Sequence, residues 1–341
     1  MLTGHSPRIP TAQHPSTPGA DPRPPITRST VISESRQPAV VVDRVARSFG
    51  EVAAVRAASL QVHAGSVTGL VGPNGSGKTT LLLMLATLLT PDAGTIRICG
   101  HDPVTDPAAV RRVIGWMPDV LGSWPSLTVR TALEVTGRMY QLDRQEAAAR
   151  AEALIRLTDL SLLADHPARV LSRGQKQKLS LARSLVHRPS VLLLDEPASG
   201  LDPQARVELR RLVRRLADEG TAVLISSHVL SELDEMADSA VYVTAGVTAD
   251  AETLAQVSTR RDWRVRALDD WQLANALAAT GLPPERVTRD GLGTLLSLDG
   301  DEHAARVLAR LVAEGAQLTA FAPAVGDLEH TFLDLNRRTT P

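Results

Sequence analysis

The chain has 341 residues, 43% of them apolar, and its 37 basic residues nearly balance its 38 acidic ones. This length exceeds that of a typical single domain, so we expect one large domain with a smaller appended module. The balanced charge provides no basic field, which argues against nucleic acid as a partner. A single cysteine excludes an internal disulfide framework, and no apolar run reaches the roughly 18 residues of a membrane span. We therefore expect a soluble, cytosolic protein.

The N-terminal segment is rich in Pro, Ser, Thr and Arg and nearly free of large apolar side chains. Such a segment cannot bury enough apolar surface to offset the entropy cost of ordering it, so residues 1–38 are predicted to be a disordered tail. The segment also lacks the continuous apolar stretch of a secretion signal, which disfavours a targeting role.

Short β-branched runs alternate with helical patterns over residues 39–250, which is typical of an α/β domain. Strands are predicted at Val40–Val45, Leu60–Val62, Val67–Val71, Val113–Met117, Val191–Leu194, Ala222–Ser226 and Ala240–Val243. The apolar run Leu81–Leu89 is too short to cross a bilayer and is predicted to be a buried helix. Helical spacing of Ala and charged residues predicts consecutive helices over Thr128–His187. We therefore expect a helical subdomain at about residues 123–188, inserted into a mixed sheet.

Residues 260–341 contain two similar strand–helix units followed by a closing strand and helix. Strands are predicted at Trp263–Leu268, Thr294–Leu298 and Gln317–Ala322, and a helix at Glu302–Glu314. The βαββαβα pattern predicts an accessory α+β module of ferredoxin-like type. It contains no recognisable chemical motif.

A glycine-rich loop follows the predicted strand Val67–Val71 and precedes a helix. Its residues are Gly72, Pro73, Asn74, Gly75, Ser76, Gly77, Lys78, Thr79 and Thr80. This spacing is that of a P-loop, the phosphate-binding loop of P-loop NTPases, so we expect an ATP-binding site. Glycines let backbone amides turn towards phosphate oxygens, Lys78 reaches the outer phosphates, and the Thr79 hydroxyl is a candidate Mg²⁺ ligand. A plain turn between strand and helix would not call for the Lys–Thr pair.

Two acidic residues end the predicted strand Val191–Leu194. A buried parallel strand delivers Asp195 and Glu196 to the carboxyl edge of the sheet, where the P-loop also lies. Asp195 is therefore a candidate to hold Mg²⁺, directly or through water, and Glu196 to orient or deprotonate the attacking water. The alternative is an ordinary acidic turn, which the upstream P-loop disfavours.

The segment Leu-Ser-Arg-Gly-Gln at residues 171–175 precedes a helix predicted at Lys176–His187. It resembles the signature sequence of ATP-binding cassette (ABC) proteins, with Arg173 in place of the commoner second glycine. Ser172, Gly174 and Gln175 are therefore candidate nucleotide contacts, since a helix N-terminus suits a γ-phosphate. A simple helix cap explains Ser172 when it is taken alone. The order of the motifs favours the signature.

The resemblance implies three further site residues. Asp202, in Ser-Gly-Leu-Asp at residues 199–202, stands in the loop that meets the opposing subunit. His228 matches the switch histidine, which contacts the γ-phosphate and joins Lys78 and Glu196 as a catalytic residue. Phe49 occupies the place of the aromatic residue that stacks on adenine, the alternative being a core aromatic.

One position departs from the family pattern. A glutamine commonly follows the strand predicted at Val113–Met117 and links Mg²⁺ to the transmembrane partner, whereas this chain has Asp119 there. Asp119 is still a candidate oxygen ligand for the metal, but it cannot donate a hydrogen bond as an amide does. Its charge adds repulsion near phosphates in the absence of Mg²⁺.

The resemblance also implies the assembly. Two cassettes, as a homodimer or a cassette pair, would face head to tail and enclose ATP and Mg²⁺ between the P-loop of one and Ser172 of the other. With one cassette and no predicted span, this chain would power a separate transmembrane permease from the inner face of a bacterial cell membrane. Arg173 and the segment at residues 328–333 resemble the cassettes of drug-efflux and sodium-efflux exporters. An importer ATPase subunit and a soluble, non-transport ABC ATPase are the alternatives.

Overall fold

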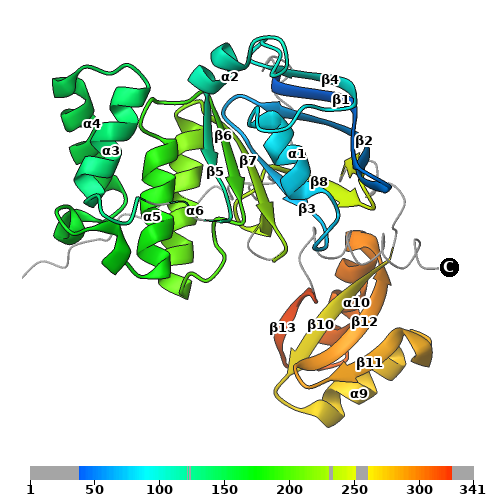
Figure 1. Ribbon diagram of the computed structural model, residues 1–341. Coiled ribbons are helices and arrows are strands. Elements are labelled where there is room, and N and C mark those ends of the chain that lie inside the picture. Colours follow the sequence, from blue (N-terminus) through cyan, green and yellow to red (C-terminus); the bar gives the residue numbers. More distant parts are fainter. Residues whose placement is uncertain (1–37, 121, 123, 230–232, 251–259, 325–341) are drawn as a thin grey trace, which may run out of the picture. The chain divides into compact units, whose positions relative to one another are not determined.

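The computed structural model describes residues 38–120, 122, 124–229, 233–250 and 260–324 (Figure 1). The predicted N-terminal tail, the predicted last helix and the segment at residues 328–333 therefore lie outside the described residues. The described elements form a large mixed sheet with its helices, and a second, four-stranded sheet near the end of the chain.

The described part of the chain holds a nine-stranded sheet in the order β4-β1-β2-β9-β8-β3-β7-β6-β5 (Figure 1). Its strands are β1 (Pro38–Phe49), β2 (Val52–His63), β3 (Val67–Val71), β4 (Ala93–Ile98), β5 (Ile114–Met117), β6 (Val191–Asp195), β7 (Ala222–Ser227), β8 (Ser239–Thr244) and β9 (Val247–Asp250). Strands β8, β3, β7, β6 and β5 pair in parallel, whereas β4, β1 and β2 pair antiparallel, which confirms the predicted mixed sheet. The central strands β3, β6 and β7 are buried along their whole length, as expected of parallel strands covered on both faces.

Two groups of helices cover the two faces of this sheet. They are α1 (Lys78–Leu85) and α2 (Pro107–Val113) on one face, and α5 (Arg173–Ser184) and α6 (Pro203–Asp218) on the other (Figure 1). The side chains of β6 alternate accordingly, since Leu193 packs in the core of the α1 face and Leu192 and Leu194 pack in the core of the α5 and α6 face. The sheet therefore lies between two separate apolar cores.

The predicted helical insertion contains α3 (Val129–Met139), α4 (Arg144–Leu157) and α5. Thr128 caps α3, and Asp143 forms a capping box with Glu146 at the start of α4. Arg130 of α3 pairs with Glu152 of α4 and with Asp165, so ion pairs as well as apolar contacts hold the two helices together.

Several predicted boundaries are wrong. The helix predicted over Leu81–Leu89 ends at Leu85, because Thr87 adopts a left-handed φ of +63°, and Leu88 is exposed. The helix predicted to begin at Lys176 begins at Arg173. Val113 ends α2 instead of opening a strand. The sequence reasoning also missed β4, a largely exposed segment that pairs with β1 far back in the chain, and β9, a four-residue strand that forms a hairpin with β8.

The four-stranded sheet has the order β11-β12-β10-β13, with antiparallel neighbours throughout. Its elements are β10 (Arg260–Ala267), α9 (Asp270–Ala279), β11 (Val287–Asp290), β12 (Gly293–Asp299), α10 (Gly300–Ala313) and β13 (Leu318–Pro323). Val265, Leu277, Leu296 and Leu311 are buried in a core of their own. The chain order is βαββαβ within the described residues, while the ferredoxin-like assignment stays a prediction.

Candidate functional site

The glycine-rich loop joins the end of β3 to the start of α1, as the sequence predicted. Two of its glycines have no room for a side chain. A Cβ atom at Gly72 would lie 2.3 Å from the carbonyl oxygen of Val243, and one at Gly77, which has a φ of +108°, would lie 2.4 Å from that of Ala54. The loop therefore fits tightly against β2 and β8, with its backbone amides free to turn towards a ligand.

Lys78 lies inside this loop and is only 6% exposed. Its ammonium group donates hydrogen bonds to the carbonyl oxygens of Gly72 at 2.7 Å and Pro73 at 3.2 Å. Burial lowers the pKa of Lys78 below its usual value, and the nearby carboxylates of Glu196 and Asp195 oppose that shift. A cation held in a loop of amides is suited to bind phosphate oxygens.

Thr79 and Asp195 meet at the carboxyl edge of the sheet. The Thr79 hydroxyl donates to Oδ2 of Asp195 at 3.0 Å. The other carboxylate oxygen, Oδ1, accepts a hydrogen bond from the hydroxyl of Ser226 at 2.6 Å. Asp195 is 1% exposed and Ser226 is fully buried, so the carboxylate is fixed in orientation by two hydroxyl groups.

Glu196 follows directly and faces His228. The Nδ1 atom of His228 lies 2.7 Å from Oε2 of Glu196, and the Glu196 amide donates to the Ser226 hydroxyl at 2.9 Å. Glu196 adopts a φ of +49°, a left-handed conformation that is unfavourable for a residue with a Cβ atom. Its backbone is held by its contacts, which is common at functional sites.

The segment at residues 171–175 forms the beginning of α5. Ser172 caps the helix, and its side chain and that of Gln175 form a capping box. Arg173 donates to the Ser199 hydroxyl at 3.2 Å, and its guanidinium packs over Gly200. The segment therefore contacts the loop at residues 199–202.

Comparison with known proteins identifies relatives of this arrangement. The sequence profile described as ABC transporter matches residues 55–199. The daunorubicin/doxorubicin resistance ATP-binding protein DrrA of Streptomyces peucetius is 32% identical over 309 residues, which cover 87% of this chain and 92% of that protein. The chain belongs to the ABC transporter family.

Other ABC relatives match a shorter part of this chain. The daunorubicin resistance ATP-binding protein DrrA3 of Streptomyces coeruleorubidus is 42% identical over 208 residues, which cover 61% of this chain and 66% of that protein. The Nod factor export ATP-binding protein I of Burkholderia lata is 40% identical over 202 residues, which cover 59% of this chain and 66% of that protein. The chain thus spans slightly less than two thirds of the length of these two relatives.

Solved structures of ABC cassettes share the fold. The structure of an ATP-binding subunit of an ABC transporter gives a TM-score of 0.59 at 24% identity and covers 64% of this chain and 92% of that one. A dimeric ATP-binding cassette bound to ADP and Pi in a post-hydrolysis state gives a TM-score of 0.58 at 24% identity and covers 62% of this chain and 98% of that one. These likenesses confirm the predicted α/β cassette fold.

The remaining predicted ABC site residues are spread around this centre. Phe49 ends β1 with its ring 47% exposed and the Arg47 guanidinium 5.0 Å from the ring centre, so it is not a core aromatic. Asp202 caps α6 by accepting from the Ala205 amide at 2.9 Å. Asp119 is exposed beyond the end of β5, the strand beside β6, which places it on the same sheet edge as Asp195.

Two residues of this ABC site were not singled out from the sequence. Ser226 connects Asp195 to the backbone of Glu196, and its only sequence signal is a hydroxyl at the end of a predicted strand. Gln177 is 4% exposed and donates to the Glu196 carbonyl oxygen at a long 3.4 Å. A buried polar residue in the second turn of the signature helix is the signal that identifies it.

Among the described residues, no helix is both long and apolar enough to cross a membrane.

Proposed function

We propose that this chain hydrolyses ATP and thereby powers export through a separate membrane permease. The observation that carries the proposal is the convergence of Lys78, Thr79, Asp195, Glu196 and His228 at one edge of the sheet. Relatives named for drug resistance and for Nod factor export favour export over import or a non-transport role. In this proposal the chain lies on the cytoplasmic face of the cell membrane.

The site residues fit Mg²⁺ as well as ATP. The Thr79 hydroxyl and the Asp195 carboxylate lie 3.0 Å apart and supply the hard oxygen donors that Mg²⁺ prefers. The described residues hold no group of three or more His, Cys, Asp or Glu side chains arranged for a metal, which suits an ion completed by phosphate and water oxygens. Bound Mg²⁺ would neutralise charge on the phosphates. Thr79 and Asp195 would hold it, with Asp119 as a further candidate ligand.

The two residues beyond Asp195 have complementary roles in the proposed reaction. The Glu196 carboxylate accepts the proton of the attacking water or orients that water. His228 donates from Nδ1 to this carboxylate and so fixes its direction, while its second ring nitrogen is left to face the γ-phosphate. Lys78 binds the outer phosphate oxygens, whose negative charge also favours its protonated form.

We also infer a head-to-tail pair of cassettes. Ser172 and Arg173 are exposed at the N-terminus of α5, where backbone amides and the helix dipole favour an anion. Within one chain the Ser172 hydroxyl accepts a hydrogen bond from the Gln175 amide, and Arg173 donates one to Ser199 in the loop at residues 199–202. A second copy would bring this N-terminus, with Gly174, Gln175 and Asp202, against the nucleotide held by the P-loop.

A groove beside Asp119 is the proposed contact for the permease. It has a volume of about 440 Å³ and lies between α3, α5 and the segment that follows β5. Its lining includes Trp116, Trp124, Met139, Tyr140 and Arg183. The Arg183 guanidinium lies 4.7 Å above the Trp124 ring, and Met139 is 69% exposed. An apolar segment of the permease would cover these side chains, next to the residue that departs from the family pattern.

We propose the following division of the chain: a tail at residues 1–38, the ATPase cassette at residues 39–250 and an accessory α+β domain at residues 260–341. The separate core of the four-stranded sheet supports the last boundary.

The hydrolysis step is tested with purified full-length protein and Mg²⁺-ATP. Glu196→Gln removes the carboxylate charge but retains size and hydrogen-bonding oxygen, so ATP binding should persist while turnover falls by about 10² to 10⁴. Wild-type turnover in this variant would overturn the assigned role. Absence of hydrolysis by the wild-type chain, both alone and with its permease, would overturn the function.

The permease contact is tested by co-purification with a candidate permease, a membrane protein without a cassette of its own. Met139→Asp introduces a charge into the groove and should reduce recovery of the complex. Leu162→Asp is the matched control, because Leu162 is 93% exposed and is not part of the groove lining. Circular dichroism checks that both variants are folded. Equal recovery with both would exclude the groove as the contact.

A further inference from the structure

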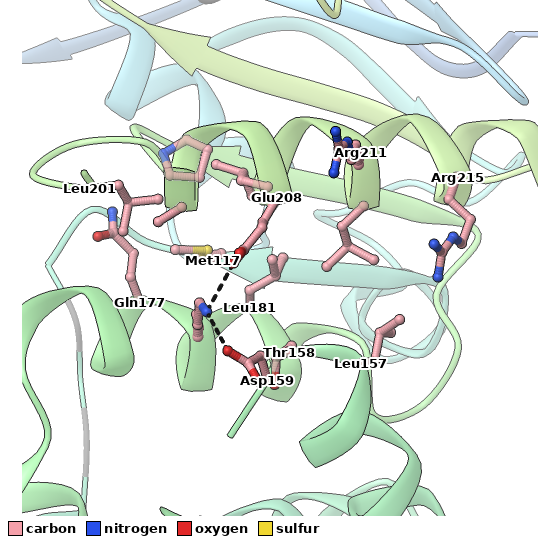
Figure 2. A pocket seen from close by; sticks show the side chains of 15 residues that line it. Met117, Leu157, Thr158, Asp159, Gln177, Leu181, Leu201, Glu208, Arg211 and Arg215 are labelled. Atoms are coloured by element: carbon pink, nitrogen blue, oxygen red, sulfur yellow. Dashed lines mark hydrogen bonds and ion pairs between the residues drawn. The ribbon is translucent and has the colours of Figure 1, made fainter. Parts of the chain in front are cut away.

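A second cavity lies on the opposite flank of α5, between the end of α4, α5 and α6 (Figure 2). Its volume is about 260 Å³, just below the roughly 300 Å³ at which pockets for drug-sized ligands begin. Figure 2 shows Gln177 and Leu201 at one end of it and Leu157 and Arg215 at the other. The cavity therefore suits a small, elongated ligand.

The wall of this cavity is mainly apolar. Met117, Leu181, Leu209 and Leu212 line it, and each of these side chains is buried. Binding of a ligand to these side chains is favoured by about 25 cal/mol for each Å² of apolar ligand surface that is removed from water. The middle of the ligand is therefore aliphatic or aromatic.

Gln177 forms part of the wall at one end of the cavity. This side chain is 4% exposed, and its Nε2 atom is directed at the Glu196 carbonyl oxygen. Its Oε1 atom has no hydrogen-bond partner within the described residues, but it is covered by protein, so a ligand in the cavity meets the aliphatic part of this side chain.

The rim of the cavity is charged. Lys178 bridges Asp159 at 3.4 Å and Glu208 at 3.1 Å, as the dashed lines in Figure 2 show. Arg211 and Arg215 lie one turn apart on α6, and neither forms an ion pair within the described part of the chain. The three cations outnumber the two carboxylates, so the rim favours an anion.

We propose that this cavity binds a small amphipathic carboxylate, with its aliphatic chain directed towards Gln177 and its carboxylate beside Arg211 and Arg215. The aliphatic chain matches the leucine-lined wall, and the carboxylate matches two guanidinium groups that form no ion pair within the described part of the chain. This site is separate from the P-loop and from the groove proposed for the permease.

The cavity is also joined to the catalytic loop. Pro197, the residue after Glu196, forms part of its wall, and so does Leu201, next to Asp202. A bound ligand would hold Gln177, Pro197 and Leu201 in place and resist their movement. Occupancy should therefore lower the rate of ATP hydrolysis, an effect that rests on the proposed function.

Binding is measured by calorimetry on the full chain without nucleotide, using decanoate as the probe. We expect saturable binding at one site. The uncharged 1-decanol should bind up to about fivefold more weakly, which corresponds to the loss of an exposed ion pair. Absence of saturable binding of decanoate would overturn the proposal.

Variants locate the ligand. Arg211→Gln and Arg215→Gln should each weaken decanoate binding by up to about fivefold, as for an exposed ion pair, and leave 1-decanol binding unaffected. Arg112→Gln, on the exposed side of α2, is the matched control and should bind decanoate as wild type does. Equal binding of decanoate by both Arg211→Gln and Arg215→Gln and by wild type would place the ligand elsewhere and overturn the site.

The regulatory step is measured as ATP hydrolysis with saturating decanoate. We expect at least about a twofold loss of rate in wild type, reduced in Arg215→Gln at the same ligand concentration. An unchanged rate in wild type with the site occupied would overturn the regulation. Binding without any ATPase activity would count against the proposed function alone, and ATPase activity without binding against the cavity alone.

Discussion

The imidazole Nδ1 atom of His228 lies 2.7 Å from the carboxylate of Glu196. Because the carboxylate accepts, Nδ1 carries a proton, and the other ring nitrogen can donate to a γ-phosphate oxygen only when it carries a proton as well. His228 is half exposed, while the Glu196 side chain is only 15% exposed. The pair thus has one member that is open to solvent and one that is largely covered by the protein.

We expect His228→Ala to lower ATP turnover by about 10², because Glu196 loses the donor that fixes its direction. ATP affinity should change much less, since Lys78 and the P-loop amides remain. Turnover and ATP affinity are measured separately on the full chain. His63→Ala, at the exposed end of β2, is the control and should behave as wild type. Equal turnover in both variants would rule out a role for His228.

We expect Ser226→Ala to destabilise the chain by about 1 to 3 kcal/mol, because it leaves a buried oxygen of Asp195 without its donor. The free energy of unfolding from urea denaturation gives this number. Ser184→Ala removes a buried hydroxyl whose hydrogen bond within the described residues is to the Leu181 carbonyl oxygen, so it should cost less. A smaller loss for Ser226→Ala than for Ser184→Ala would contradict the bridging role.

We expect Asp119→Gln to retain ATPase activity, because Asp119 is exposed and the amide still offers an oxygen to the metal. The Mg²⁺ concentration for half-maximal rate should not fall, since one negative charge beside the site is removed. The rate is measured over a Mg²⁺ titration. A complete loss of hydrolysis would show that the carboxylate itself is required.

We expect His187 to make the chain less stable in mild acid. Burial lowers the pKa of His187 below its usual value, so between that value and the lower pKa the unfolded chain binds more protons than the folded one. The free energy of unfolding therefore decreases as the pH falls through this window. His187→Phe keeps the ring that stacks on Tyr140, with ring centres 3.7 Å apart, but does not titrate.

The measurement for His187 is the difference in the free energy of unfolding between pH 7 and pH 5. This difference should be smaller in His187→Phe than in wild type. The variant should be less stable at pH 7, because it loses the hydrogen bond between Nε2 and the Ile114 carbonyl oxygen at 2.8 Å. An identical pH dependence in both proteins would show that other groups cause it.

Local sequence was sufficient to predict the centre of the site. The strand ending at Val71, the loop that reaches Thr79 and the strand that delivers Asp195 each depend on neighbours within about ten residues, so periodicity and spacing reveal them. Parallel pairing of β3, β7 and β6 then places the motifs at one sheet edge.

The features that could not be predicted from the sequence depend on contacts between residues far apart in the chain. Strand β4 is half exposed and exists because it pairs with β1, some fifty residues earlier in the chain. The bridge from Ser226 to Asp195 joins residues 31 positions apart, and no local pattern marks it. The leucine-lined cavity arises where three helices meet, so its shape depends on packing and not on any motif.

Helix α5 contributes side chains to the permease groove on one flank, through Ser180 and Arg183, and to the amphipathic-ligand cavity on the other, through Gln177 and Leu181. One helix thus lines both proposed sites, and the two sites share no lining residue. If occupancy of one site shifts α5, the two affinities are linked, and each partner must change the binding of the other by the same factor. A compound that binds the cavity would then also weaken or strengthen binding of the proposed permease.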